Sequence, residues 1–526
     1  MIEPNWKSQP AMPLLHRSCS TPGLRRSKRG MQSMHSHYLD APLATHLTNF
    51  TRSGRCHNFH AVPWPAVLDA ASSEFAQHYR ALLGADLSRI DASWSGSAVD
   101  SFFTPHGPLA DAQQKTAAAF GADATFFGTS GTSASNQIAL ESLRFPGAEV
   151  LMDCAAHQSL LFAAEAMTVV PTPCAGSVEN PRVDVEATAR LLARRAAEGR
   201  PFDILVLSAT GYDGRKLRLD RVLPLLVTSS PTTAIVIDEA WSAMHAFVPS
   251  LADKTALAVA SSLPLRAPVL VTHSAHKTMA ALRQGSYLHV LGSASDIERV
   301  RLARYRIHTT SPSWPILTSL DLARAHAAQF GAREFSRTIS LKVKLESMLR
   351  AEPLTARMLV SSTGDAYYDF DPMVLRLHVG SRSRDIRDWL LREHHVLVTI
   401  AGDQLVVRLH FGVTDHDLQA LMKGLSLLES GFGSQSNILP PTGLQDFEPS
   451  IGSCSREYII PYPPGVPLAR PGELWTERHA MALAQERARG AEIYRLAAGG
   501  STRRATSSDE ISVGAVLNPS AEDEHA

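Results

Sequence analysis

One lysine of this chain follows an apolar run that is typical of a buried strand, where a lysine is unusual. Lys277 comes shortly after the run 268–272, in a turn that also holds Ser274 and His276. Most lysines are solvated cations, whereas a lysine that forms a Schiff base must be partly desolvated so that its amine is neutral and nucleophilic. The neighbouring hydroxyl and imidazole can donate hydrogen bonds to an anionic phosphate. The segment therefore predicts a nucleophilic lysine beside a phosphate-binding turn.

An acid stands in a comparable place earlier in the chain. Asp238 ends the apolar run 233–237, and Trp241 follows it. One interpretation is a helix N-cap, which is a common role for an acid after a strand. The other is an acid that pairs with a protonated pyridine nitrogen and so keeps the ring an electron sink. Because Lys277 follows a later run in the same way, we favour the second interpretation.

A loop rich in glycine and hydroxyl side chains lies between the expected strand 124–127 and a helix. Gly131 permits a close approach of the backbone, and Thr132, Ser133 and the helix N-terminus can bind a phosphate. The loop has neither the lysine of a P-loop nor the pattern GxGxxG. A nucleotide triphosphate is therefore a disfavoured ligand.

His157 follows the run 149–152. A histidine there is either a satisfied structural residue or a flat ring that stacks on a cofactor, and its position after a strand end favours stacking. The sequence contains no HExxH, no clustered Cys/His pattern and no GxSxG. We therefore expect neither a catalytic metal nor a serine hydrolase.

Short apolar runs alternate with helical stretches between about residues 115 and 310. Because the runs are continuously apolar, they are typical of strands buried on both faces. This alternation predicts a mostly parallel sheet between two layers of helices, with ligands beyond the carboxyl ends of the strands. The runs are 124–127, 149–152, 203–207, 233–237, 268–272 and 286–290.

Downstream, the pattern indicates a smaller α/β domain. One or two long helices are expected over 316–350, and another helix over 415–428. Residues 430–455 are rich in Gly, Ser and Pro and indicate a linker. The segment 458–468 has too many prolines for regular structure, yet it is apolar enough to pack on another surface. The expected strands of the smaller domain are 373–379, 395–400 and 404–411.

Composition and charge exclude several classes of protein. The 526 residues are 44% apolar and 19% charged, with a formal net charge of zero, which gives no sign of a nucleic-acid-binding chain. The five cysteines are scattered and form no CxxC, so a reducing cytoplasm fits best. No apolar run is long enough to span a membrane. The basic first 36 residues are typical of a transit peptide or a flexible arm, and we expect the arm.

Taken together, these segments resemble the fold-type-I pyridoxal-5′-phosphate (PLP) enzymes, and more narrowly the Orn/Lys/Arg decarboxylase family. The resemblance extends over roughly residues 80–475, in the order of the family's own motifs. The segments that carry it are DSFFTPHGPLADAQQKTAAAFGADATFFGTSGTSASNQ (100–137), DCAAHQS (153–159), SATGYDGRKLRL (208–219), IDEAWSAMH (237–245), SAHKTMAALRQGSYLHV (274–290), HTTSPSWPILTSLDLAR (308–324) and IIPYPPGVPLARPGE (459–473).

The resemblance implies a role for each candidate residue. Lys277 would hold PLP as a Schiff base, Asp238 would pair with its pyridine nitrogen, and His157 would stack on its ring, with Trp241 beside the site. Because the family builds its sites at a dimer interface, with a segment like 309–312 reaching the partner's cofactor, we expect a homodimer or an assembly of dimers. The residues expected to bind the phosphate or its surroundings are Gly131, Thr132, Ser133, Ser274 and His276.

The implied fold class is α/β, with a fold-type-I PLP-dependent transferase-like large domain, a mostly parallel sheet and smaller α/β C-terminal domains. No receiver-like domain is expected at the N-terminus, so the chain resembles the shorter, biosynthetic type of the family. The expected parts are a flexible basic N-terminal arm (1–45), an N-terminal segment (46–115), the large PLP-binding domain (116–315), connecting helices with a small α/β domain (316–430), a C-terminal domain with the YPPGVP motif (431–497) and a disordered tail (498–526).

The sequence departs from the family pattern around the expected substrate side. Neither 20–30 nor 59–64 matches the family's PGHK-like block cleanly, and the segment 87–100 is altered. Arg283 stands where a small polar residue is commoner. These positions leave the identity of the substrate amino acid open.

The leading hypothesis is PLP-dependent decarboxylation of arginine, lysine or ornithine to the corresponding amine of polyamine biosynthesis. The enzyme would be cytoplasmic, act on a small molecule and bind neither nucleic acid nor membrane. Carboxylates should bind the distal cation of the substrate, with Glu239 and Glu473 as candidates. The alternatives are another PLP reaction (transamination, oxidation or decarboxylation of an unusual amino acid) and a catalytically silent regulatory homologue. Intact Lys277, Asp238 and His157 argue against the silent homologue.

Overall fold

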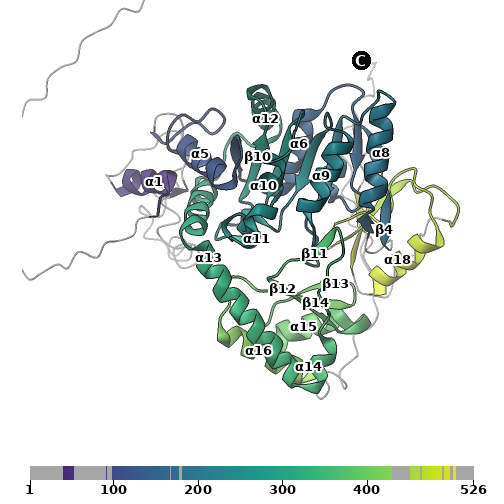
Figure 1. The fold of residues 1–526 in the computed structure, drawn as a ribbon. Helices are drawn as coiled ribbons and strands as arrows, with labels where there is room; N and C mark the ends of the chain where they lie inside the picture. The colour runs from purple at the N-terminus through teal and green to yellow at the C-terminus, as the bar shows by residue number, and fades with distance from the viewer. Residues whose placement is uncertain are drawn as a thin grey trace, which may run out of the picture. The chain divides into compact units, whose positions relative to one another are not determined.

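A seven-stranded sheet forms the centre of the large domain (Figure 1). The computed structural model describes residues 39–52, 90–91, 98–165, 167–176, 181–428, 450–462, 465–488, 491–497 and 502–504. In sheet order the strands are β1 (Ala124–Gly128), β10 (Ser286–Leu291), β9 (Val269–His273), β8 (Ala234–Asp238), β6 (Ile204–Ser208), β2 (Glu149–Met152) and β3 (Thr168–Pro171). Only β10 runs antiparallel to its neighbours, and the others share one direction. The mostly parallel sheet predicted from the sequence is confirmed.

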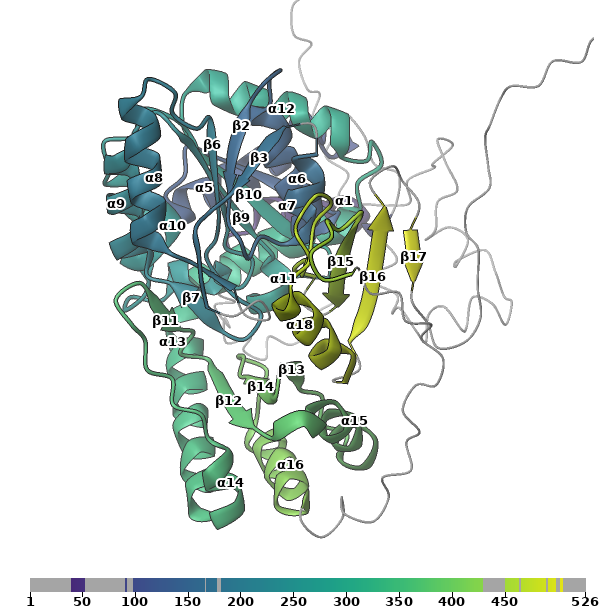
Figure 2. The same ribbon diagram turned by 90° about the vertical axis from the view of Figure 1, so that its right-hand side faces the viewer.

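Helices cover both faces of this sheet (Figures 1 and 2). Along β8, Ile235 and Ile237 belong to one core cluster while Val236 belongs to the other, because neighbouring side chains of a strand point to opposite faces. This double burial explains the continuously apolar runs of the sequence. Helices of the first face are α5 (Pro108–Phe120), α8 (Val185–Ala197), α9 (Leu219–Ser229) and α10 (Ala256–Ser261). Helices of the second face are α6 (Gly131–Leu143), α7 (Gln158–Ala163) and α12 (Ala294–Ile307).

One helix of 38 residues, α13 (Trp314–Ala351), connects the large and small domains (Figure 2). The sequence predicted one or two helices here. Near its start, Leu317 and Leu320 pack in the core of the large domain. Near its end, Leu345 and Leu349 pack in the core of the small domain. The single helix α13 therefore contributes side chains to the cores of both domains.

The small domain has a three-stranded sheet with order β12-β14-β13. Its strands are antiparallel, and its core includes side chains from two helices of its own in addition to those of α13. The strand expected over 395–400 forms only at its end, because His395 adopts a left-handed conformation (φ 55°) where the preceding helix ends. The elements are β12 (Val374–His378), α15 (Ser383–His394), β13 (Thr399–Ala401), β14 (Gln404–Arg408) and α16 (Asp415–Ser426).

The C-terminal part contains β15 (Glu457–Tyr462), α18 (Glu477–Ala488), β16 (Glu492–Ala497) and β17 (Thr502–Arg504). The prediction that 458–468 lacks regular structure is wrong for its first residues, which form β15. This strand is at one edge of the sheet β15-β16-β17, and an edge strand tolerates Pro461 because one of its sides needs no partner. Ile459 and Ile460 are buried, as the apolar character of the segment predicted.

Two structured elements overlap the parts expected to be flexible. Helix α1 (Pro42–Arg52) begins before residue 45 and packs Leu43 and Leu47 into the core of the large domain. Strand β17 lies within the expected tail 498–526. The two candidate positions for the PGHK-like block, 20–30 and 59–64, lie outside the described residues.

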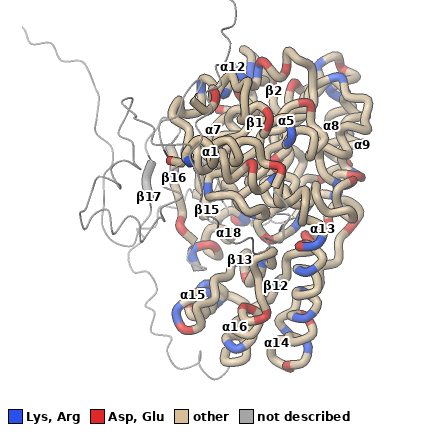
Figure 3. The backbone as a smooth tube through the Cα atoms, turned by 90° about the vertical axis from the view of Figure 1, so that its left-hand side faces the viewer, with Lys and Arg blue, Asp and Glu red and all other residues tan. Residues whose placement is uncertain are grey.

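Charged residues of both signs are mixed along the chain (Figure 3). None of the helices that the structure describes is both long and apolar enough to cross a membrane. Across the same described ranges, no cluster of three or more His, Cys, Asp and Glu residues is arranged to hold a metal ion.

Candidate cofactor site

The residues singled out from the sequence meet at the carboxyl ends of β2, β8 and β9. Asp238 is the last residue of β8 and lies beside Thr272 of β9 in the pairing register. Lys277 lies just beyond β9, in the short helix α11 (Ala275–Thr278). His157 follows β2 and caps α7. Parallel strands end at the same edge of a sheet, and this brings together residues that are far apart in the sequence.

The side-chain amide of Asn136, in α6, is hydrogen-bonded to three residues at this edge of the sheet. Its Nδ2 donates to Asp238 Oδ2 (3.0 Å) and to Ser159 Oγ (3.1 Å), and its Oδ1 accepts from the Thr272 hydroxyl (2.7 Å). The backbone N–H of Ala240 donates to Asp238 Oδ1 at 3.0 Å. The Asp238 carboxylate is buried and fixed from two sides. Asn136 was not predicted, because an amide inside a helix gives no signal in the sequence.

The imidazole of His157 is held in one tautomer. The backbone N–H of Ser159 donates to His157 Nδ1 (3.2 Å), and the Ser159 hydroxyl lies 2.9 Å from the same atom. Nδ1 is therefore an acceptor, and the ring proton resides on Nε2. Burial lowers the pKa of His157, Asp238 opposes this shift, and Lys277 adds to it. The ring is accordingly neutral at neutral pH.

The amine of Lys277 lies against an indole ring. Its Nζ is 4.4 Å from the centroid of the Trp241 ring. Burial lowers the pKa of Lys277, Asp238 partly restores it, and the cations Arg408 and Arg283 lower it further. The amine therefore loses its proton more readily than a solvated lysine does, as a nucleophile requires.

Hydroxyl side chains from two elements meet at the start of α6. The hydroxyl of Thr132 is hydrogen-bonded to that of Ser274, and both residues are buried. Ser133, one residue further along α6, is exposed. These hydroxyls lie at a helix N-terminus, which attracts anions. The arrangement suits a phosphate.

The turn after α11 is hydrogen-bonded to two other residues that were expected to bind the phosphate, Gly131 and His276. Gly131 adopts φ +74°, and its N–H donates to the carbonyl of Gln284 at 2.8 Å. His276 Nδ1 lies 2.9 Å from the Gly285 carbonyl oxygen, which can only accept, so Nδ1 carries the proton. Burial lowers the pKa of His276. Gly131 thus contributes its backbone conformation, and His276 can donate from Nε2 only when its ring is protonated on both nitrogens.

An arginine from the small domain reaches the same indole ring as Lys277. The guanidinium carbon of Arg408, at the end of β14, is 4.1 Å from the centroid of the Trp241 ring. Arg408 Nη1 donates to Asp371 Oδ2 at 3.1 Å. Burial acts to raise the pKa of Asp371, but His245 and Arg408 outweigh it and bring the pKa to about 2. This anchored cation was not predicted, and its only signal was a basic residue within the apolar run LVVRL.

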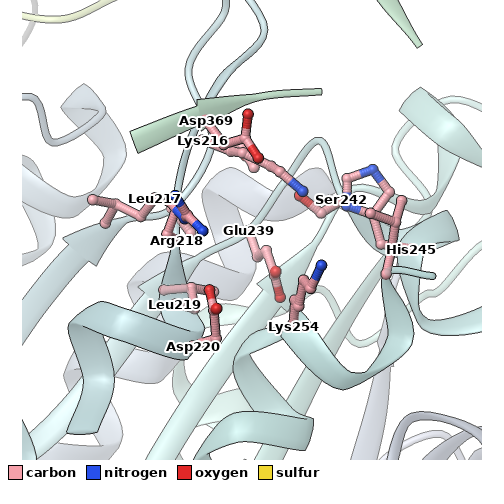
Figure 4. A pocket seen from close by; sticks show the side chains of 13 residues that line it. Lys216, Leu217, Arg218, Leu219, Asp220, Glu239, Ser242, His245, Lys254 and Asp369 are labelled. Atoms are coloured by element: carbon pink, nitrogen blue, oxygen red, sulfur yellow. The ribbon is translucent and has the colours of Figure 1, made fainter. Parts of the chain in front are cut away.

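The candidate carboxylates for a distal cation are both engaged elsewhere. Glu239 points away from Asp238, as neighbouring strand residues do. Its Oε2 lies 3.1 Å from His273 Nε2, and His273 Nδ1 lies 3.0 Å from His289 Nε2, which forms a buried chain. Glu473 accepts a hydrogen bond from the backbone N–H of Arg470 (3.1 Å). Glu239 also borders a cavity of about 40 Å³, together with Lys216, Arg218, Asp220, Ser242, His245, Lys254 and Asp369 (Figure 4).

The C-terminal part reaches the loop that carries His157. The carbonyl oxygen of Gly465, in the YPPGVP segment, accepts from the backbone N–H of Gln158 at 3.1 Å. Gly465 has φ +85°, and a Cβ added there would lie 3.5 Å from His157 Nε2. The segment therefore borders the imidazole on its Nε2 side.

The four parts of this site fit PLP. An amine of lowered pKa, a fixed carboxylate, a neutral imidazole and a hydroxyl-lined helix N-terminus suit the aldehyde, the pyridine nitrogen, the ring and the phosphate, respectively. On a mostly parallel sheet between two helical layers, they define the class of fold-type-I PLP-dependent enzymes.

The family model described as "Orn/Lys/Arg decarboxylase, major domain" matches residues 41–372, more than half of the chain. The protein belongs to the Orn/Lys/Arg decarboxylase family and is a PLP-dependent amino-acid decarboxylase, as the motifs of the sequence predicted.

Curated relatives carry three different substrate names. Arginine decarboxylase of Halalkalibacterium halodurans is 28% identical over 437 residues, which cover 76% of this chain and 85% of that relative. Lysine decarboxylase LdcA of Pseudomonas aeruginosa is 30% identical over 270 residues (48% and 35% of the two chains). The inducible ornithine decarboxylase of Escherichia coli is 29% identical over 285 residues (50% and 38%). Relatives with three different substrate names are thus similar to this chain at comparable identity, and identity singles out none of the three substrates.

Solved structures with the same fold include two lysine decarboxylases. The constitutive enzyme of Escherichia coli has a TM-score of 0.68 at 20% identity, covering 85% of this chain and 77% of its own. LdcF of Francisella novicida has a TM-score of 0.71 at 18% identity, with coverages of 89% and 81%. At these identities the likeness shows the fold.

Proposed function

We propose that this protein converts arginine, lysine or ornithine into the corresponding amine and carbon dioxide at a site formed by Lys277, Asp238 and His157. The observation that carries the proposal is one hydrogen-bonded network. Asn136 donates to the Asp238 carboxylate and to Ser159, whose side chain and backbone N–H hold the His157 ring. The network fixes an anion and a flat neutral ring in one orientation within electrostatic reach of the Lys277 amine.

Each residue of the site has a distinct task in this proposal. When bound, PLP supplies a pyridine ring that accepts the electron pair left on the substrate Cα as carbon dioxide departs. Lys277 Nζ would hold the cofactor covalently between turnovers and, after taking up a proton, would give one to Cα once the carboxylate has left. Asp238 would keep a proton on the pyridine nitrogen, and His157 would lie against the ring. Thr132, Ser133, Ser274 and His276 surround the phosphate.

Arg408 places a fixed positive charge on one side of the site, and this charge orients a basic amino acid. Its guanidinium is held by Asp371 and lies against Trp241, as Lys277 does. A fixed cation attracts the α-carboxylate of the substrate and repels the cation at the other end. We infer that the carboxylate docks toward Arg408 and that the distal cation points away from it.

Replacing Arg408 by glutamine should therefore raise KM more than it lowers kcat. A hydrogen bond to a charged group contributes about 1.5–3 kcal/mol, and we expect KM for the substrate to rise by about 10- to 150-fold. Arg408→Lys keeps the charge and should recover part of the loss, and Arg200→Gln, at an exposed position, should have no effect. Steady-state kinetics measures both constants. A fall in kcat at unchanged KM would contradict this role.

Replacing Gly465 by alanine should weaken PLP binding through His157. A left-handed conformation costs a residue with a Cβ about 1–2 kcal/mol, and relief of this strain would shift the loop that Gly465 contacts. We expect the dissociation constant of PLP to rise by about 5- to 30-fold. Gly472→Ala is a matched control, because Gly472 has φ +84° but nothing within 4 Å of an added Cβ. An equal loss of PLP affinity in both variants, measured by absorption titration, would show that only general strain is at work.

The experiment that tests the proposed function is an absorption titration combined with product analysis. The holoenzyme should show the visible band of a lysine Schiff base, and arginine, lysine and ornithine are added in turn. The expected result is a change of the band with one of them, and release of carbon dioxide and the matching amine. A keto acid without carbon dioxide would identify transamination instead. A bound cofactor with no turnover of any amino acid would favour the silent homologue.

The oligomeric state is a further part of the proposal. We propose a cytoplasmic homodimer or an assembly of dimers, on the basis of the family resemblance of the 309–312 segment. Light scattering of the purified holoenzyme measures the mass directly, and a monomer that turns over substrate would contradict this part.

A further inference from the structure

Two cysteines lie in neighbouring segments just beyond the ends of β2 and β3. The two strands pair in parallel with Met152 opposite Pro171. The pairing continues past the strand ends, because the N–H of Thr172 donates to the Met152 carbonyl (2.8 Å) and its hydroxyl accepts from the N–H of Cys154 (3.0 Å). The side chains of Cys154 and Cys174 lie within interaction range of each other. Cys174 is exposed and Cys154 is half-buried, so a small oxidant can reach the pair.

The two thiols differ in acidity. Interaction with the Cys154 side chain lowers the pKa of Cys174 to about 7, against a smaller opposing effect of burial and with help from the backbone N–H of Arg182. The same interaction, together with burial, raises the pKa of Cys154. Cys174 is therefore the more readily deprotonated of the two thiols, and the thiolate is the form that attacks a disulfide.

We propose that Cys154 and Cys174 form a reversible disulfide, with Cys174 as the attacking thiol and Cys154 as the resolving thiol. A small disulfide such as oxidised glutathione serves as the oxidant. Cys174 Sγ attacks one of its sulfurs and releases one glutathione thiolate. Cys154 Sγ, after losing its proton to solvent, attacks Cys174 Sγ and releases the second glutathione thiolate. Two protein thiols are oxidised to one disulfide while one glutathione disulfide is reduced to two thiols.

Formation of the Cys154–Cys174 disulfide should move the loop that carries His157. Asp153, which precedes Cys154, is buried, and its carboxylate accepts from the N–H groups of Ala155 (2.7 Å) and Ser208 (2.8 Å). The two sulfurs must approach to about 2.05 Å for a disulfide to form, so Cys154 moves against these restraints. We expect oxidation to displace His157 and weaken PLP binding. This effect rests on the proposed cofactor site, whereas formation of the disulfide does not.

Peptide mapping tests the disulfide directly. No Lys or Arg lies between Arg144 and Arg182, so both cysteines fall in one tryptic peptide, 145–182. After treatment of the full-length holoenzyme with oxidised glutathione, this peptide should weigh two hydrogens less and resist alkylation. Dithiothreitol should restore two alkylated cysteines. Two free thiols in the peptide, or a lasting glutathione adduct on Cys174 with Cys154 free, would overturn the proposal.

Three variants give the matched controls. Cys154→Ser and Cys174→Ser should each abolish the intramolecular bond. Cys454→Ser removes an exposed cysteine elsewhere in the chain and should form the bond as the wild type does. Loss of the bond in Cys454→Ser would point to a different pairing and would overturn the assignment of the pair.

The effect on the cofactor is measured by PLP titration of the reduced and the oxidised protein. We expect the dissociation constant to rise about tenfold on oxidation in the wild type and in Cys454→Ser, and to stay constant in Cys174→Ser. An unchanged constant in protein that contains the disulfide would overturn the link to the cofactor site. Failure of the reduced protein to bind PLP would count against the proposed function instead, so the two failures are distinguishable.

Discussion

Lys277→Ala is expected to lower kcat by at least about a thousandfold, because it removes both the covalent attachment and the proton donor of the site. The side chain lies against Trp241 with a pKa lowered by burial. Its removal takes a desolvated amine out of the site and leaves the Asp238 network intact, so the variant should fold and still bind PLP without a covalent bond. Borohydride reduction followed by mass spectrometry measures the attachment, and only the wild type should retain PLP on the peptide that contains residue 277.

The control for this variant is Lys423→Ala, which removes an exposed lysine from α16 of the small domain. It should keep both the covalent adduct and full activity. A covalent PLP adduct that persists in Lys277→Ala at another lysine, together with retained turnover, would contradict the assignment of Lys277.

The central fold was predictable because its strands carry a local signal. Strands β6, β8 and β9 are buried on both faces and therefore read as continuous apolar runs. Strand β15 was missed because the prolines of the segment 458–468 argue against regular structure, and only the position of β15 at a sheet edge makes Pro461 acceptable. That position depends on the pairing with β16, which no local pattern shows.

The candidate site was predictable only where a residue lies at or shortly after the end of a strand. Asp238 ends β8, His157 follows β2 and Lys277 follows β9, and parallel topology then brings them together. Asn136 and Arg408 were not predicted. Asn136 acts because α6 packs over β8 and β9, and Arg408 because α13 joins the small domain to the large one. Asn136 lies more than 100 residues from Asp238 in the sequence, and Arg408 lies more than 100 residues from Trp241. Neither residue type stands out in its own segment.

The second large effect is expected for Asp238→Asn, which keeps the shape of the side chain and removes its charge. Loss of one partner of a buried charge pair costs about 3–5 kcal/mol, so we expect kcat to fall by about 150- to 5,000-fold. Asp253→Asn makes the same chemical change at an exposed position and should leave kcat unchanged. PLP should still attach to Lys277 in Asp238→Asn, which separates a loss of chemistry from a loss of cofactor.

The pH dependence of Asp238→Asn distinguishes an electrostatic role from a structural one. Without the carboxylate, the pKa of the pyridine nitrogen falls, because a nearby anion no longer stabilises its protonated form. The remaining activity should therefore increase relative to the wild type as the pH is lowered, since more of the ring becomes protonated. A structural role, through the hydrogen bonds from Asn136 and Ala240, would lower kcat by the same factor at every pH. Measuring kcat of both proteins across the stable pH range decides between the two, and a constant ratio would contradict the proposed pairing of Asp238 with the pyridine nitrogen.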